Sequence, residues 1–286
     1  MANLKEIRNR IASIGSTMQI TSAMKMVSAS KLKKAQDAIV QMRPYANKLT
    51  ELLQSLSATL DSEDGGAFTQ QKQINKVLIV VITSNRGLCG AFNSSIIKHT
   101  NHLIESKYAG KEVSILSIGK KGFDIHSKDQ NIYNNKSEVY DDLTFENVAV
   151  IAEDLMEQFL NGSYDKIELV YNRFKNAATQ IITEEQYLPI LQPEKKNISN
   201  LDYIFEPSKE EIVKGLIPKS LKTQLFKALR DSYASEHGAR MTAMHKATDN
   251  ASELRDDLLL QYNKARQAAI TNEILEIVGG AEALKG

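Results

Sequence analysis

One long stretch near the C-terminal end decides the fold: KSLKTQLFKALRDSYASEHGARMTAMHKATDNASELRDDLLLQYNKARQAAITNEILEIV (219–278). It contains no proline, and Gly238 is its only glycine. As one helix it would be about 90 Å long, whereas the mean globular helix has about 11–12 residues. Such a helix needs a second helix beside it or a partner around it, because one compact core cannot cover it.

The apolar side chains of this stretch recur every three or four residues, which predicts a buried seam. The expected seam positions are Met241, Met244, Ala247, Ala251, Leu254, Leu258, Tyr262, Ala265, Ala268, Asn272, Leu275 and Val278. Because many of them are small or polar, the seam permits close helix approach but buries little apolar area per turn.

The N-terminal end supplies a second helix, for which Asn3 is the expected cap. Its first apolar positions have the strict three-four spacing of a coiled coil: Leu4, Ile7, Ile11, Ile14 and Met18. We then expect the register to slip through Ile20, Met24 and Val27. We also expect Pro44 to kink or interrupt the helix.

The middle of the chain has a different pattern. Residues 77–82, VLIVVI, form a continuous apolar run that is typical of a strand covered on both faces. Alternating segments follow, with helices expected at 91–107 and 145–160 and strands at 112–118, 166–171, 178–188 and 201–205. This alternation predicts an α/β domain of Rossmann-like form with a mostly parallel sheet.

The predicted architecture is therefore α/β plus a long antiparallel coiled coil. Residues 1–60 form the N-terminal coiled-coil helix, 74–207 the central α/β domain and 209–286 the C-terminal coiled-coil helix. The terminal helices pair, and the last turns of the longer one project alone.

Composition narrows the class of protein. The 286 residues carry a net charge of +1, and the single Cys89 excludes an internal disulfide framework or a zinc cluster of cysteines. No apolar run is as long as a membrane span, and the N-terminus lacks the apolar core of a secretory signal. Charge is uneven, because residues 1–50 hold nine basic and two acidic side chains. This basic helix suggests an acidic partner.

The turn SNRGLCG (84–90) follows a buried strand and precedes a helix, where phosphate-binding loops are found. It lacks both the dinucleotide-binding and the Walker spacing, so we interpret it as a tight turn. No histidine is near Cys89 in sequence, which favours an unreactive buried thiol.

Other polar pairs also lack the pattern of a site. His99 and His102 share a helix face without a third ligand, so we expect them to be solvated. Each of the adjacent carboxylate pairs, Glu184–Glu185 and Asp256–Asp257, divides between opposite faces, and we expect solvated charges. We therefore expect no catalytic residue, no cofactor and no metal.

Three alternatives remain open from the residues alone. The methionines Met24, Met26, Met241 and Met244 are either core filler or an adaptable surface. The basic helix, with Lys31, Lys33 and Lys34, is compatible with a coiled-coil adaptor or a nucleic-acid-binding protein. A small-molecule enzyme that uses the SNRGLCG turn is a third hypothesis.

Three stretches together resemble one family, the gamma subunits of F-type ATP synthases of bacterial type. They are KEIRNRIASIGSTMQITSAMKMVSASKLKKAQ (5–36), TSNRGLCGAFN (83–93) and ASEHGARMTAMHKATDNASELRDDLLLQYNKARQAAITNEILEIVGGAEAL (234–284). Their order and spacing along the chain agree with that family as well, whereas residues 94–200 match it mainly in pattern.

The resemblance implies the rotor of the central stalk of a proton-translocating ATP synthase. In this family the coiled coil enters a ring of alpha and beta subunits, and the α/β domain is a foot that binds the epsilon subunit and the membrane rotor ring of c subunits. Rotation of the membrane ring is coupled to ATP synthesis or hydrolysis on the beta subunits, so the chain itself is not catalytic. It implies no nucleic acid partner and no membrane span of its own.

The resemblance also assigns contact residues. Those expected to contact the alpha and beta ring are Met24, Lys25, Arg86, Arg266 and Gln267. Tyr203 and Glu206 are assigned to the foot, at the contact with the epsilon subunit or the rotor ring. Lys25 stands where some relatives carry an acid. The single Cys89 excludes the two-cysteine regulatory segment of photosynthetic relatives, and the implied location is peripheral, on the cytoplasmic face of a bacterial plasma membrane.

Overall fold

A computed structural model describes residues 4–57, 66–69, 73–190 and 209–283. The chain divides into two compact units. One consists of the two chain ends, Met1–Ser28 and Met241–Gly286, and the other is Ala29–Arg240. The two longest helices, α1 (Leu4–Ser57) and α6 (Lys209–Ala283), each contribute to both units.

Both long helices continue through a proline. Pro44 lies inside α1 and Pro218 inside α6. Of the two alternatives expected at Pro44, an interruption of the helix is therefore wrong. Helix α6 begins at Lys209, where the C-terminal helix 209–286 was expected to begin. A proline removes one backbone hydrogen bond and crowds the preceding turn, but a long helix that is packed on both sides of the proline can accommodate that local loss.

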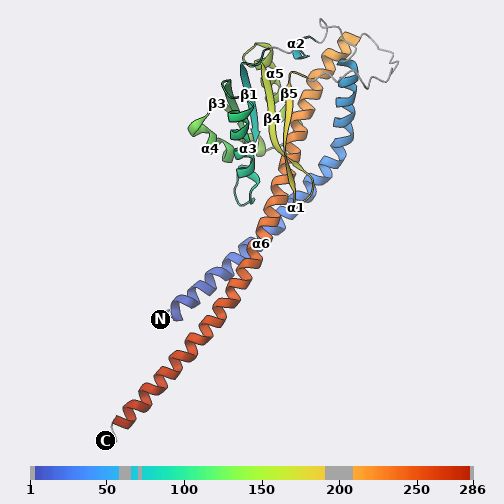
Figure 1. Cartoon of the computed structure of the whole chain (residues 1–286). Helices are drawn as coiled ribbons and strands as arrows, with labels where there is room; N and C mark the ends of the chain where they lie inside the picture. Colours follow the sequence, from blue (N-terminus) through green and yellow to red (C-terminus); the bar gives the residue numbers. More distant parts are fainter. Residues whose placement is uncertain (1–3, 58–65, 70–72, 191–208, 284–286) are drawn as a thin grey trace. The chain divides into compact units, whose positions relative to one another are not determined.

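In the unit formed by the chain ends, α1 and α6 run antiparallel (Figure 1). The Arg8 guanidinium donates to the Tyr262 hydroxyl at 2.7 Å, and the hydroxyl oxygens of Thr21 and Thr248 lie 2.8 Å apart. Residue numbers therefore fall along one helix as they rise along the other, which confirms the predicted antiparallel pairing.

The seam of α1 differs from the expected slip. Ile20 and Val27 are 60% and 57% exposed, whereas Thr21 and Ser28 are buried. The three-four spacing thus continues without a break, but polar residues occupy two of its positions. The prediction chose Ile20 and Val27 because it considered only apolar side chains. In the structure, the small hydroxyl side chains of Thr21 and Ser28 fill the close contact between the helices.

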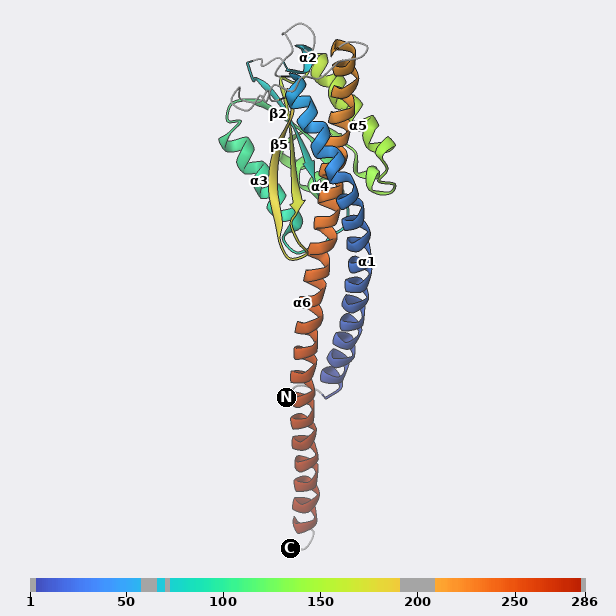
Figure 2. The same ribbon diagram turned by 90° about the vertical axis from the view of Figure 1, so that its right-hand side faces the viewer.

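The seam of α6 is confirmed at Met244 and Leu258, which are buried, but not at Leu254, which is 51% exposed. The last four predicted seam positions are also wrong within this helix pair, because they are exposed: Ala268, Asn272, Leu275 and Val278. From Arg266 to Ala283, every residue of α6 is exposed. Figures 1 and 2 both draw this last part of α6 continuing beyond the first turn of α1. The prediction of an unpaired tip is therefore confirmed within this chain.

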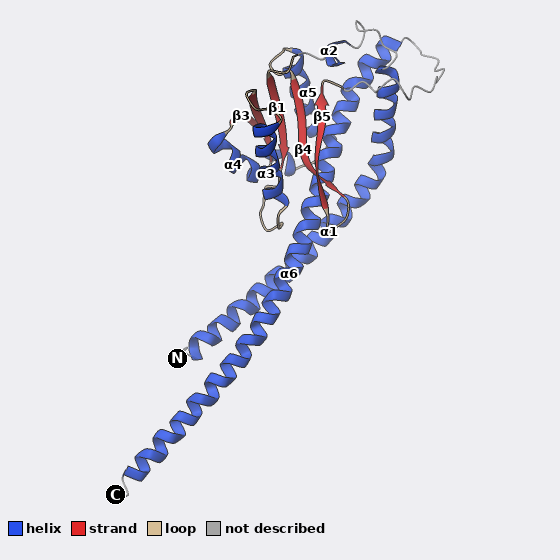
Figure 3. Ribbon diagram, in the orientation of Figure 1, coloured by secondary structure: helices blue, strands red, loops and turns tan. Residues whose placement is uncertain are grey.

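The other unit contains a five-stranded sheet in the order β3-β2-β1-β4-β5 (Figure 3). Its strands are β1 (Lys76–Ile82), β2 (Glu112–Ile118), β3 (Asn131–Asn135), β4 (Lys166–Phe174) and β5 (Gln180–Leu188). The first four are parallel, and β5 pairs antiparallel with β4. The predicted mostly parallel α/β sheet is confirmed, including the hairpin at its end.

Helices cover both faces of this sheet, as Figure 2 shows. On one face, Val77, Ile79 and Val81 of β1 pack with α3 (Phe92–Ser106). The alternate β1 residues pack on the other face with α5 (Phe145–Leu160) and with the part of α6 around Leu225. Burial on both sides explains why β1 is an uninterrupted apolar run.

Some elements were not predicted. Helix α4 (Lys120–Asp129) and strand β3 have few large apolar residues, so their periodicity is weak. The short elements α2 (Gly66–Thr69) and η1 (Ser137–Tyr140) span one turn each. The proposed cap Asn3 and the edge strand at 201–205 lie outside the described residues.

Replacing Gly119 with alanine should destabilise the α/β unit. Gly119 has φ +122°, and an added Cβ would lie 2.3 Å from the carbonyl oxygen of Thr83. We expect a loss of about 3 kcal/mol or more in the free energy of unfolding, from overpacking and backbone strain. Gly162→Ala is the control, because φ there is +71° but no atom lies within 4 Å. Equal losses from both variants in denaturant unfolding would contradict this packing.

Cysteines at Thr21 and Thr248 should form a disulfide in the folded chain, because their side chains already touch across the helix pair. The control pairs Thr21→Cys with Leu254→Cys, whose side chain is exposed. Mass spectrometry after mild oxidation should find the bond in the first variant only. A bond that forms as readily in the second would mean that the register of the two helices is different.

Candidate functional site

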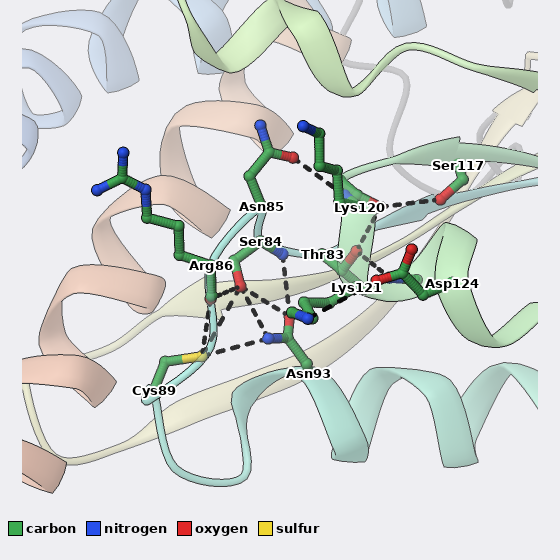
Figure 4. Close-up of polar contacts among 12 residues, drawn as sticks. Thr83, Ser84, Asn85, Arg86, Cys89, Asn93, Ser117, Lys120, Lys121 and Asp124 are labelled. Carbon is green, nitrogen blue, oxygen red and sulfur yellow. Dashed lines mark hydrogen bonds and ion pairs between the residues drawn. The ribbon is translucent and has the colours of Figure 1, made fainter.

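The turn after β1 is held by hydrogen bonds among its own residues and with Asn93 of α3 (Figure 4). The Ser84 backbone N–H donates to Asn93 Oδ1 at 2.9 Å, and the Ser84 hydroxyl donates to the Arg86 carbonyl at 2.7 Å. Asn93 Nδ2 in turn donates to Ser84 Oγ at 2.8 Å. Leu88 and Gly90 complete the turn with positive φ angles of 62° and 59°.

A buried arginine of α6 binds this turn from the other side. Arg240 Nη2 donates to the carbonyls of Arg86 at 3.0 Å and Gly87 at 3.2 Å, and its Nη1 pairs with Glu236 at 2.7 Å. Burial raises the pKa of Glu236, and Arg240 opposes that rise. A phosphate loop turns backbone N–H groups toward its ligand, but here two carbonyls face a cation. The interpretation as a structural turn is therefore supported.

The first amides of α4 are also occupied. The N–H of Lys120 donates to Asn85 Oδ1 at 3.0 Å, and that of Lys121 to the Ser84 carbonyl at 3.1 Å. The Gly122 N–H donates to Thr83 Oγ1 at 2.9 Å. These bonds join the segments that follow β1 and β2. They occupy the first three backbone N–H groups of α4, which an anion would otherwise bind.

Cys89 is buried beside this network. Its sulfur accepts from Asn93 Nδ2 at 3.3 Å, and burial raises the pKa of the thiol. A protonated, enclosed thiol is a poor nucleophile. Within the described residues, there is no group of three or more His, Cys, Asp or Glu side chains that could hold a metal ion.

Some expectations about isolated charges are wrong. His99 Nε2 lies 2.7 Å from Glu184 Oε1, so these two side chains bind each other instead of standing alone in solvent. Glu185 accepts from the Tyr171 hydroxyl at 2.7 Å and from Gln224 at 2.8 Å. The two carboxylates do point to different neighbours, but the fold packs each against a partner that is distant in sequence.

Glu168 is a buried charge that was not anticipated. Lys107 Nζ and Lys166 Nζ lie 2.8 and 2.7 Å from its Oε1. Burial alone would raise the pKa of Glu168, but the two lysines hold it below its ordinary value. It lies near the amino end of β4, whereas ligand sites of α/β sheets lie at the carboxyl ends of the strands. The group therefore stabilises the fold.

The residues assigned to partner contact do not form one cluster. Met24 and Lys25 are half-buried on α1, while Arg266 and Gln267 are exposed on α6. Since Thr21 pairs with Thr248, the level of Met24 on α6 is near His245, and Arg266 lies roughly six helical turns beyond it. In that unit the structure thus separates the assigned residues into two patches along the shaft.

Arg86 lies in the α/β unit and is exposed, and Figure 4 shows its side chain directed away from the bonded turn. Its carbonyl is fixed by Ser84 and Arg240. The positive charge of Arg86 acts to lower the pKa of Glu236, against the larger effect of burial. Tyr203 and Glu206 lie outside the described residues.

Sequence reasoning missed Arg240 and the polar seam residues Thr21 and Ser28. Extending the seven-residue spacing past Met18 without requiring apolar side chains would have found the seam. No local signal marks Arg240, because its carbonyl partners are about 150 positions away along the chain.

Comparison with known proteins covers nearly the whole chain. Residues 3–284 match the family model described as ATP synthase. The ATP synthase gamma chain of Flavobacterium johnsoniae is 70% identical over 288 residues, covering 100% of each chain.

Solved structures agree in fold. A chain of the Tetrahymena thermophila mitochondrial ATP synthase central stalk and c-ring aligns with TM-score 0.59 at 27% identity, covering 80% of this chain and 99% of that one. A chain of the Euglena gracilis mitochondrial assembly of OSCP, F1 and c-ring aligns with TM-score 0.70 at 21% identity, covering 98% and 94%. From the full-length match and the shared fold, the chain belongs to the gamma chain family of ATP synthases.

Proposed function

We infer that this chain is the central-stalk rotor of a proton-translocating ATP synthase, and one observation carries the proposal. From Arg266 to Ala283, α6 is exposed on every side, although it contains large apolar residues. Those that are about half exposed or more are Ile270, Ile274, Leu275, Ile277 and Val278. At about 100° per residue these side chains share one broad face of α6. A contiguous apolar face that is left exposed marks a surface for a partner, and a ring of alpha and beta subunits supplies that cover.

The faces of the shaft differ, which the proposed coupling requires. Ile20, Met26 and Val27 present apolar surface on α1, whereas α6 at the same level exposes the charged Lys246 and Asp249. A rotor can shift the equilibrium of one site relative to another only through differential contacts. As the shaft turns, its unlike faces would contact the three catalytic sites one after another and bring them into different states. Those catalytic sites belong to the beta subunits.

The proposed contacts with the ring are the two shaft patches and Arg86. Among the described residues, none donates to or accepts from the side chains of Arg266 or Gln267, so both are available to a partner. Arginine can bind a carboxylate with two parallel hydrogen bonds. Lys25 adds a positive charge beside Met24, which favours an acidic surface on the ring.

The α/β unit is proposed as the foot, which binds the epsilon subunit and the rotor ring of c subunits. Within the described residues, no helix is both long and apolar enough to cross a membrane. The chain would then be held through its partners, as a peripheral component on the cytoplasmic face of a bacterial plasma membrane. Tyr203 and Glu206 are the residues proposed for the foot contact.

Arg266→Ala should weaken coupling in the assembled complex without unfolding the chain, because the side chain has no internal partner. Loss of a charge-assisted hydrogen bond of about 1.5–3 kcal/mol should lower turnover by roughly tenfold or more if that bond forms in the rate-limiting state. ATP hydrolysis and proton pumping of membrane vesicles measure this. The control is Lys264→Ala, a neighbouring exposed cation. Unchanged turnover in both variants would exclude the role of Arg266.

A cysteine in place of Gln267 should crosslink to a ring subunit. The native Cys89 is 2% exposed, so the chain without the new cysteine serves as the blank. Zero-length or short bifunctional reagents applied to the assembled complex should join the chain to an alpha or beta subunit and stop ATP turnover, and a reducible reagent should allow recovery. Full turnover with quantitative crosslinking would contradict rotation of this part of the chain.

A further inference from the structure

A basic cleft lies in the α/β unit, and it shares no lining residue with the turn described above. It has a volume of about 540 Å³. Its lining residues are Arg43, Arg173, Phe174, Lys175, Ile181, Lys227 and Asp231. They come from α1, from the β4–β5 hairpin and from α6, all within residues 29–240. The volume falls in the range of small-molecule sites, about 300–1,000 Å³.

The walls of this cleft carry three cations that are not held in ion pairs. In the described part of the chain, no side chain lies within hydrogen-bond or ion-pair distance of Arg173, Lys175 or Lys227. The Asp231 carboxyl is near enough for the charges of Lys227 and Arg173 to lower its pKa, against the larger effect of burial. Three such charges around one hollow repel one another, and a bound anion relieves that repulsion. Phe174 and Ile181 add an apolar surface between them.

The floor is built differently. Arg43 Nη2 donates to Asp231 Oδ1 at 3.2 Å and to the Phe174 carbonyl at 3.3 Å, which joins α1, α6 and the hairpin. The Asp231 side chain is 1% exposed, and its second oxygen, Oδ2, is buried without a hydrogen-bond partner. An unpaired buried carboxylate oxygen is costly. Burial raises the pKa of Asp231 and Arg43 opposes that rise, so the floor offsets little of the positive charge of the walls.

The cationic walls define the ligand chemistry. Arginine and lysine bind phosphoryl oxygens well, through charge and directed hydrogen bonds. Nucleoside phosphates and inorganic phosphate both carry such oxygens. We propose that the cleft binds a phosphoryl group, presented by a nucleoside phosphate or by inorganic phosphate.

The test uses the purified full-length chain at 0.15 M salt, with MgADP, inorganic phosphate and adenosine as probes in equilibrium dialysis. The proposal expects one saturable site for MgADP that inorganic phosphate displaces and adenosine does not. Arg173→Ala and Lys227→Ala should each weaken binding by about tenfold, the effect of losing one charge-assisted contact. Thermal unfolding of each variant shows whether it remains folded.

Lys120→Ala and Lys121→Ala are the matched controls, because both remove an exposed cation of the same unit outside the cleft. They should leave the dissociation constant unchanged. No saturable binding of either MgADP or inorganic phosphate at millimolar concentration, equal losses in the controls, or displacement by adenosine would each overturn the proposal. Displacement by poly-glutamate as readily as by phosphate would also overturn it, in favour of an acidic protein segment. None of these measurements depends on rotation, so their failure would leave the proposed rotor function untouched.

Discussion

The structure depends on how α6 is covered along its length. A helix within a protein owes most of its stability to the packing of its apolar face against other elements. Helix α6 extends over 75 residues, so it needs such packing along its whole length. In the α/β unit, Leu221, Leu225 and Leu229 belong to the core beside the sheet. In the other unit, Met244 and Leu258 are buried beside α1. Beyond Ala265 this chain offers no cover, and the remaining apolar surface is what makes a surrounding partner necessary.

The helix pair itself is held by small and polar contacts. Thr21 and Thr248 meet at a position where a coiled coil usually has a large apolar residue, and Arg8 binds Tyr262 near the start of α1. Such polar pairs fix the register of two helices but add little apolar burial. The polar contacts thus fix the register of the helix pair. The outer surface of the pair remains available for contacts with the surrounding subunits, which change as the pair turns.

The fold was largely predictable where a physical pattern repeats. Clear apolar patterns predicted four elements: the β1 run, the strands 112–118 and 166–171, and the helix 145–160. In each of them, packing in the folded chain agrees with the local pattern. The unpaired tip followed from the unequal lengths of the end helices. Helix α4 and strand β3 were missed because their sequences KKGFDIHSKD and NIYNN contain few large apolar residues. The slip at Ile20 was wrong because small hydroxyl residues, which hydropathy ignores, occupy the seam.

The candidate sites were less predictable for a different reason. Arg86 and Arg266 were assigned from the family resemblance, and the structure adds only that their side chains are exposed. The Arg240 contact with the turn and the cleft around Arg43 and Asp231 join segments that are far apart in sequence. The spacing of residues within one segment carries no information about contacts between distant segments. The full-length family match also leaves the hypotheses of a nucleic-acid adaptor or a small-molecule enzyme without support.

Rotation is the central claim, and observation of single assembled complexes tests it most directly. The complex would be fixed to a surface through its beta subunits, with a bead attached to a cysteine that replaces the exposed Lys128 of α4. On addition of ATP, the account predicts turning in one direction with three stops per revolution, one for each catalytic subunit. ATP hydrolysis at a normal rate while the bead shows only undirected Brownian motion would contradict it.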